Sequence, residues 1–222
     1  MKVNEPLLRR LMQEFLKENR KLNLSAFRTD EHSWVGNILD SLAILNGSGD
    51  LFIGAKKMLD LGTGGGFPLL PLAVSLPDLS CTGMDATQKK IDAVERITRS
   101  LEIKNVRLIC GRAEELGHDP GLRESFGLVT SRAVAEIPVL LEYMAPFAKK
   151  GGILAMWKSV KIADELASSV KAQELLGTSY FKTYTYDLGL GWGERCILFF
   201  RKTRNLPDTY PRRNGAVKAK PL

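Results

Sequence analysis

Residues 58–68 read Met-Leu-Asp-Leu-Gly-Thr-Gly-Gly-Gly-Phe-Pro, and this stretch decides the fold. A short apolar run at 58–61 enters a glycine cluster, and an apolar helical pattern leaves it over 69–76. The order predicts a strand, a tight turn and a helix, which together open a nucleotide-binding α/β unit. Glycine permits the turn and lets a ligand lie against bare main chain. Pro68 suits the first turn of the helix, where its missing N–H has no partner to lose.

The spacing of the glycines differs from that of a dinucleotide fingerprint. That fingerprint would place its third glycine at Phe67, whereas the pattern here is Gly62-x-Gly64-x-Gly66. A second apolar run, 79–84, ends in Asp85, where a strand-end carboxylate is placed to hold both hydroxyls of a ribose. The whole resembles motif I and the acidic loop of the class I S-adenosylmethionine methyltransferases. A glycine-rich turn without a ligand is the plainer alternative, and the carboxylates Asp60 and Asp85 weigh against it.

The composition is that of a globular protein of one domain with an appendage. The chain has 222 residues, of which 44% are apolar and 26% charged. No apolar run approaches the ~20 residues that a membrane span requires, and the N-terminus lacks the apolar centre of a signal peptide. The three cysteines stand singly in apolar runs, so we expect buried, reduced thiols. With only two histidines, a metal site is not expected. We expect a cytoplasmic protein without a membrane partner.

The net charge of +7 gathers toward the two ends of the chain. From Arg201 onward there are seven basic residues and one acidic residue, and the first segment adds six basic residues between Arg9 and Arg28. Basic ends around a nearly neutral middle favour a polyanionic partner such as nucleic acid. The alternative is a solvated charged face, because charge runs alone are weak evidence.

The order of the apolar patterns predicts an α/β fold with a mainly parallel sheet flanked by helices. Residues 1–50 carry helical patterns at 5–21 and 35–45 and are expected to form a helical cap over one end of the sheet. The core spans 51–203, and a basic C-terminal arm, read as extended, spans 204–222. Within the core we expect strands near 57–61, 80–84, 106–110, 126–131 and 153–157, helices near 68–76, 91–101, 138–144 and 161–175, and a short turn at 112–115. Two last β-rich runs, 181–186 and 195–201, suit an antiparallel pair at the sheet edge.

Short pieces along the whole chain resemble the glucose-inhibited division protein B family. The pieces are 19–25, Ile38-Leu39-Asp40-Ser41-Leu42, 60–68 with Pro71-Leu72, Asp85 with Lys89-Lys90, Ser131-Arg132-Ala133, and Tyr210-Pro211-Arg212-Arg213 with Gly215, Lys218 and 220–222. Three positions depart from the family pattern. Asn37 stands where the family usually has histidine, Ser159 follows Lys158 in place of glycine, and Glu18 replaces a tryptophan. The first departure bears on any role of that histidine in positioning RNA.

The resemblance implies a class I S-adenosylmethionine-dependent methyltransferase, Rossmann-like in fold, that makes 7-methylguanosine in 16S ribosomal RNA. Its partner would be 16S rRNA, the 30S subunit or an assembly intermediate of that subunit. The expected cofactor residues are Gly62, Gly64, Gly66, Phe67, Asp85, Ala113, Glu114 and Arg132. The last of these would contact the substrate or the cofactor, in the latter case through the methionine carboxylate. The expected RNA contacts are Arg112, Lys158, Arg212, Arg213, Lys218 and Lys220. Asp60 would anchor the glycine loop or face the cofactor's ammonium group through water.

Methyl transfer to guanine N7 places few demands on the protein's side chains. That nitrogen already presents an in-plane lone pair and carries no proton, so no general base is needed and no catalytic dyad is expected. The rate enhancement would come from positioning the methyl donor and the base, and from electrostatic stabilisation of the charge that moves to the base. Two alternatives from other classes remain: an NAD-dependent oxidoreductase on a similar sheet, and a non-catalytic RNA-binding protein that keeps the fold.

Overall fold

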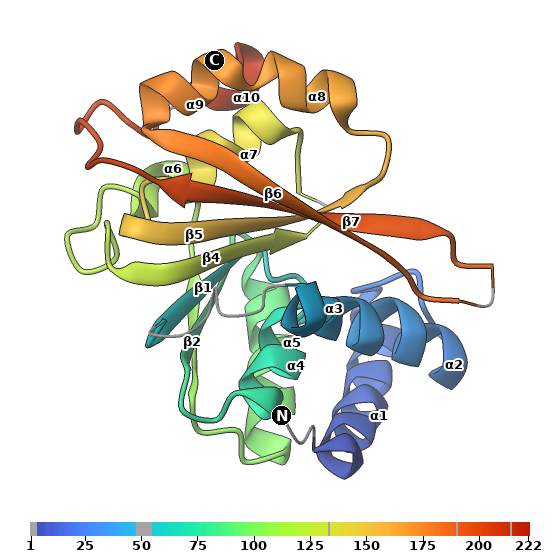
Figure 1. The fold of residues 1–222 in the computed structure, drawn as a ribbon. Helices are drawn as coiled ribbons and strands as arrows, with labels where there is room; N and C mark the ends of the chain where they lie inside the picture. Colours follow the sequence, from blue (N-terminus) through green and yellow to red (C-terminus); the bar gives the residue numbers. More distant parts are fainter. Residues whose placement is uncertain (1–3, 48–54, 133, 190, 214) are drawn as a thin grey trace.

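A seven-stranded sheet in the order β3-β2-β1-β4-β5-β7-β6 forms the centre of the molecule (Figure 1). The computed structural model describes residues 4–47, 55–132, 134–189, 191–213 and 215–222. The strands are β1 (Lys57–Leu61), β2 (Ser80–Asp85), β3 (Val106–Cys110), β4 (Phe126–Arg132), β5 (Ala148–Ser159), β6 (Thr178–Asp187) and β7 (Glu194–Lys202). The first five strands pair in parallel, and β7 is antiparallel to both β5 and β6. The predicted parallel sheet with an antiparallel pair at its edge is confirmed.

Helices cover both faces of this sheet, as alternating strands and helices require. The helices α4 (Leu69–Ser75) and α5 (Gln88–Ser100) lie on one face, and α7 (Ile137–Met144), α8 (Ala163–Ser168) and α9 (Val170–Leu176) lie on the other (Figure 1). The single helix expected at 161–175 is interrupted at Ser169. The turn expected at 112–115 is the short helix α6 (Ala113–Leu116), because Ala-Glu-Glu-Leu is a run of strong helix formers.

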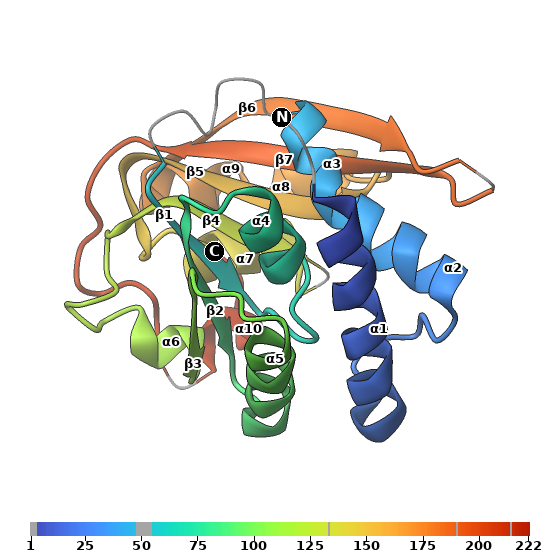
Figure 2. The same ribbon diagram turned by 90° about the horizontal axis from the view of Figure 1, so that it is seen from below.

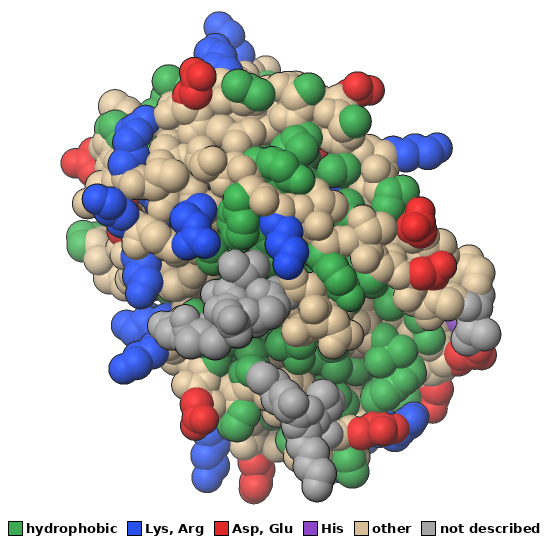
Figure 3. All heavy atoms as spheres, viewed as in Figure 1, with side chains coloured by type: hydrophobic (Ala, Val, Ile, Leu, Met, Phe, Trp, Pro, Cys, Tyr) green, Lys and Arg blue, Asp and Glu red, His purple; other side chains and the backbone are tan. Residues whose placement is uncertain are grey.

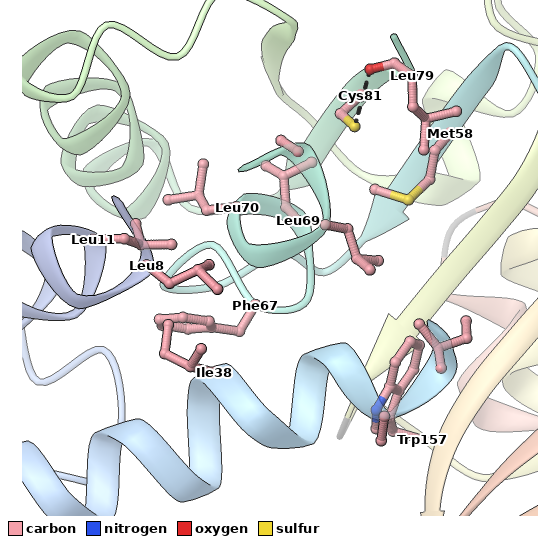
Figure 4. Packing of buried hydrophobic residues seen from close by; sticks show 14 of the residues in the cluster. Leu8, Leu11, Ile38, Met58, Phe67, Leu69, Leu70, Leu79, Cys81 and Trp157 are labelled. Carbon is pink, nitrogen blue, oxygen red and sulfur yellow. Dashed lines mark hydrogen bonds between the residues drawn. The ribbon is translucent and has the colours of Figure 1, made fainter. Parts of the chain in front are cut away.

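The N-terminal helices pack on one face of the sheet and also reach the carboxyl ends of its parallel strands. They are α1 (Glu5–Leu22), α2 (Asp30–Ser33), η1 (Trp34–Leu39) and α3 (Asp40–Gly47), and Figure 2 shows α1 beside α4 and α5. The crossover helices α7, α8 and α9 pack on the opposite face of the sheet. The β4–β5–β7 part of the face that carries α4 and α5 is therefore open for the N-terminal helices. Leu8, Leu11 and Ile38 are fully buried in one cluster with Phe67 and Trp157 (Figure 4). The boundary predicted at residue 50 falls outside the described residues and stays a prediction.

The C-terminal segment is folded onto the molecule, so the expectation of an extended arm is wrong. Its Leu206 and Val217 are buried, the latter in α10 (Ala216–Ala219), and both join the core under α7. The Arg123 guanidinium donates hydrogen bonds to the backbone carbonyls of Tyr210 and Leu206, at 2.8 and 3.1 Å. Apolar residues spaced through the segment and these backbone acceptors explain why it packs.

Two further expectations concern the thiols and the membrane. Cys81 and Cys196 are buried, but Cys110 is exposed because it ends the edge strand β3, so the expectation of three buried thiols is wrong for Cys110. All three cysteines are free. In the part of the chain that the structure describes, no helix has the length and apolarity needed to cross a membrane.

Candidate functional site

The glycine loop between β1 and α4 is tied to the neighbouring strand by its own backbone. The N–H groups of Gly62 and Thr63 donate to the carbonyl of Met84, at 2.8 and 2.9 Å. Gly62 has φ of 73°, and a Cβ there would lie 2.6 Å from Val134 Cγ2. Gly64 has φ of 55°, and among the described residues the only atom within 4 Å of a Cβ there is the Gly62 carbonyl oxygen, at 3.8 Å. Bare main chain therefore faces open space at Gly64, as a ligand cradle requires.

Gly66 and Phe67 have different roles in this loop. Gly66 is buried in the turn just before α4, and a Cβ there would lie 2.7 Å from Leu70 Cδ1. It permits close packing of loop and helix and does not line the cavity, so its expected direct contact with the cofactor loses support. Phe67 lines the cavity, and its ring meets Phe15 edge-on with centroids 4.7 Å apart.

The carboxylate of Asp85 organises the end of β2 beside this loop. It accepts hydrogen bonds from the backbone N–H of Gly64 at 3.0 Å and of Thr87 at 2.9 Å. Lys90 Nζ lies 3.8 Å away. The predicted strand-end carboxylate thus lies against the glycine loop and faces the same cavity. This is where a carboxylate can accept from the hydroxyls of a ribose.

A cavity of about 580 Å³ opens at the carboxyl ends of the parallel strands. Most of the predicted cofactor residues line it: Gly62, Gly64, Phe67, Asp85, Ala113, Glu114 and Arg132. Arg112 and Lys218, predicted as RNA contacts, line it too. A bare main-chain cradle, a strand-end carboxylate and a volume of this size fit an adenosyl cofactor.

Glu114 is fixed at one wall of the cavity by a residue from α7. The Tyr143 hydroxyl donates to Glu114 Oε1 at 3.3 Å. Burial, followed by the negative charge of Glu114, raises the pKa of Tyr143 to about 12. The phenol therefore stays protonated and keeps donating at neutral pH. Tyr143 is buried in the core and also lines the cavity.

Arg132 ends β4, but the N-terminal helices engage most of its guanidinium. Its Nη1 donates to the Gly36 carbonyl at 2.8 Å and to Asp40 Oδ2 at 2.9 Å, and its Nη2 donates to Asn37 Oδ1 at 3.0 Å. Its charge is already paired, so the expected contact with a methionine carboxylate loses support. Asn37, at the position of the family histidine, acts here as a buried acceptor for this arginine.

Sequence reasoning gave no role to Asp40, Tyr186 or Arg195. The Tyr186 hydroxyl donates to Asp40 Oδ1 at 2.6 Å, and Arg195 Nη1 lies 3.6 Å from the same oxygen. Asp40 and Arg195 line the cavity. The signal for Asp40 was a carboxylate on an otherwise apolar helical stretch. Arg195 had none, because only the antiparallel insertion of β7 brings it to this place.

The predicted RNA contacts divide into engaged and exposed side chains. Lys158 donates to Glu165 Oε2 at 2.6 Å and to the Ala135 carbonyl at 2.8 Å. Arg212 forms a two-pronged ion pair with the fully buried Glu142, with a shortest distance of 2.6 Å. An RNA role for these two loses support, since their charges are compensated within the fold. The exposed members of the predicted set are Arg112, Arg213, Lys218 and Lys220.

Asp60 lies behind the loop and is fully buried. The Thr130 hydroxyl donates to its Oδ1 at 2.8 Å. Burial outweighs this hydrogen bond and raises the pKa of Asp60 to about 6. The residue does not line the cavity, so the structure gives no support to a contact with the cofactor's ammonium group. Among the described residues, no cluster of histidine, cysteine and acidic side chains suits a metal ion.

Comparison with known sequences gives a family match over most of the chain. A family model described as "rRNA small subunit methyltransferase G" matches residues 4–186. The Ribosomal RNA small subunit methyltransferase G of Desulfitobacterium hafniense is 37% identical over 92% of this chain and 83% of its own length. The protein of the same name from Carboxydothermus hydrogenoformans is also 37% identical, over 97% of this chain and 91% of its own.

Solved structures share the fold at low sequence identity. An O-methyltransferase from Bacillus cereus in complex with SAH has a TM-score of 0.61 at 17% identity, covering 86% of this chain and 90% of that one. A variant of the 16S rRNA (adenine(1408)-N(1))-methyltransferase from Catenulisporales acidiphilia has a TM-score of 0.56 at 14% identity, covering 73% and 92%. These likenesses confirm the methyltransferase-type fold.

Proposed function

The chain belongs to the rRNA small subunit methyltransferase G family, and from this membership we propose that it methylates N7 of a guanine in 16S ribosomal RNA. It is an S-adenosylmethionine-dependent enzyme, so neither an oxidoreductase nor a non-catalytic binder describes it. The observation that carries the proposal is the intact glycine loop with Asp85, which line one cavity in a chain that matches the family over residues 4–186.

The cofactor end of the cavity is built from three neighbouring strand ends. When bound there, S-adenosylmethionine supplies the methyl group from its sulfonium. We assign the main chain at Gly62 and Gly64 to the cradle and Asp85 to the ribose hydroxyls. Ala113 and Glu114, after β3, are assigned to the adenine. All five of these residues line the cavity, which supports the assignment.

The chemistry at guanine N7 suits the side chains that are present. Since N7 has a free lone pair and no proton, no residue needs to act as a general base. Asp85 and Glu114 each already accept a hydrogen bond from the protein, as expected for groups that hold and orient. The protein's task is to bring N7 in line with the methyl group and to accommodate the positive charge that the base acquires.

The substrate within the cell is proposed to be 16S rRNA in the 30S subunit or in an assembly intermediate, in the cytoplasm. The test is a transfer assay with labelled S-adenosylmethionine on small subunits from cells that lack this activity, with mass mapping of the product. One new 7-methylguanosine is the expected result. Label on another base would refute the N7 assignment, and no label on either 30S subunits or free 16S rRNA would refute the proposed substrate.

A further inference from the structure

The cavity has a second end, opposite the adenine wall, that the cofactor assignment does not use. We call it the acceptor lobe and define it as Phe27, Gly36, Asn37, Asp40, Arg132 and Arg195. Its residues come from the N-terminal helices, the connection between α1 and α2, the end of β4 and the start of β7. Gly36 and Asn37 lie in η1, a π-helical stretch, which is a distortion often found at functional sites.

Asp40 is the buried centre of the acceptor lobe. Its side chain is 1% exposed, yet three groups converge on its two carboxylate oxygens. Arg132 donates to Oδ2 at 2.9 Å, Tyr186 donates to Oδ1 at 2.6 Å, and Arg195 lies 3.6 Å from Oδ1. The backbone is held as well, because Trp157 Nε1 donates to the Asp40 carbonyl at 2.9 Å. A carboxylate in this setting has a fixed position and imposes one on its partners.

The two arginines have different amounts of freedom. Arg132 is 17% exposed and is further engaged by Gly36 and Asn37. Arg195 is 32% exposed, lies at ion-pair rather than hydrogen-bond distance from Asp40, and has its guanidinium carbon 5.8 Å from the centre of the Trp192 ring. Arg195 therefore has donors to offer to a ligand, whereas Arg132 serves mainly to hold the wall.

We propose that Asp40 is the positioning residue for the acceptor base, and that it acts through Arg195, whose guanidinium donates to guanine O6. The inference rests on the proposed function. If N7 must face the methyl group, the acceptor left on the same edge of guanine is O6, the atom that arginine commonly reads beside N7. Asp40 has a second effect through its charge. Methylation leaves the base cationic beside two guanidinium groups, and the buried carboxylate offsets part of that repulsion.

The test is a double-mutant cycle on Asp40 and Arg195. The variants are Asp40→Asn, Arg195→Ala and the double variant, assayed for kcat/KM on 30S subunits and for RNA affinity over a range of salt. Each single change is expected to lower kcat/KM by about tenfold to a hundredfold, the usual range for a hydrogen bond that involves a charged group. The kcat/KM of the double variant should be at most about twofold below that of the less active single variant, because Asp40 works through Arg195.

Three controls separate this role from a structural one. The affinity for S-adenosylhomocysteine, measured by calorimetry, should stay within about threefold in all variants, since the cofactor end is untouched. Glu31→Gln, an exposed carboxylate of the same helical segment, should leave both readouts unchanged. If Asp40→Asn fails to fold, Tyr186→Phe replaces it in the cycle, because it removes one hydrogen bond to Asp40 and keeps all charges.

Two results would overturn the inference. Multiplicative losses in the double variant would mean that Asp40 does not act through Arg195. A shallower salt dependence of RNA binding in Arg195→Ala would assign this arginine to a phosphate instead of to the base. If the parent enzyme is active and either result is found, only the inference about Asp40 and Arg195 is wrong. If the parent enzyme transfers no methyl group, the proposed function is wrong, and the RNA affinities of the same variants then decide the inference.

Discussion

Asp85 links the glycine loop to the cofactor at the scale of a single residue. Its carboxylate accepts from the Gly64 and Thr87 N–H groups, so it both shapes the cradle and faces the ribose position. Asp85→Ala removes both functions, and we expect the affinity for S-adenosylhomocysteine to fall at least tenfold by calorimetry. Asp78→Ala, an exposed aspartate just before the other end of β2, is the matched control and should change nothing. Equal affinities for parent and Asp85→Ala would remove this residue from the site.

Asp60 gives a prediction on how stability depends on pH. Its pKa is raised from 3.8 to about 6, so the folded state binds this proton more tightly than the unfolded chain. The contribution to stability is therefore fully present below about pH 4 and is lost as the pH rises through 6. At ~1.4 kcal/mol per pKa unit, the loss is about 3 kcal/mol. Asp60→Asn cannot titrate, so it should lack this loss.

Urea unfolding of the parent and Asp60→Asn between pH 4.5 and 7.5 measures the effect. The free energy of unfolding of the parent, relative to that of the variant, should decline across this range. Thr130→Val supplies a second check, because it removes the hydroxyl that donates to Asp60 and should move the decline to higher pH. A constant difference between parent and Asp60→Asn at every pH would contradict the raised pKa.

The C-terminal segment gives a prediction at the scale of the element. Arg212 donates from its side chain and from its backbone N–H to Glu142, whose side chain is fully buried on α7. Arg212→Ala would leave that carboxylate buried without its cation, which costs about 3 kcal/mol in comparable pairs. Arg213→Ala is the matched control, since this neighbouring arginine is exposed. Denaturant midpoints that move equally in both variants would show that the ion pair does not anchor the segment.

The elements that sequence reasoning predicted well share one property, a local pattern. The strand at 57–61 and the helix at 5–21 are predicted within a residue by apolar runs and helical spacing. The glycine loop and Asp85 are also local, because adjacent parallel strands bring the two turns together. Long-range contacts between individual side chains were not predicted. The Asp40–Arg195 contact depends on β7 lying beside β5, and the packing of 204–222 depends on buried partners such as Glu142 that no local pattern marks.

At the scale of the whole molecule, exposed basic side chains lie at both ends of the parallel strands. Lys218 lines the cavity, and Arg213 and Lys220 belong to the same segment. The opposite side of the molecule, where the parallel strands begin, carries Lys57, Lys149 and Lys150. Basic side chains gather there at the left of Figure 3. Both groups have three exposed cations, so net charge alone does not tell which one meets RNA.

The position of the cavity indicates which basic group contacts RNA, because a base that enters the cavity brings its own phosphates to the rim. We therefore expect Arg213→Ala/Lys218→Ala/Lys220→Ala to weaken RNA binding and to reduce the slope of log affinity against log salt by about 2, at ~0.7 to ~0.9 per phosphate contact. The matched variant Lys57→Ala/Lys149→Ala/Lys150→Ala removes the same charge from the far side and should leave the slope nearly unchanged. Filter binding of 16S rRNA between low and moderate salt measures both. If the far-side variant reduced the salt slope more than the C-terminal variant, the RNA would bind where the parallel strands begin, away from the glycine loop. The RNA would then have to reach the methyl-transfer site by a different path around the molecule.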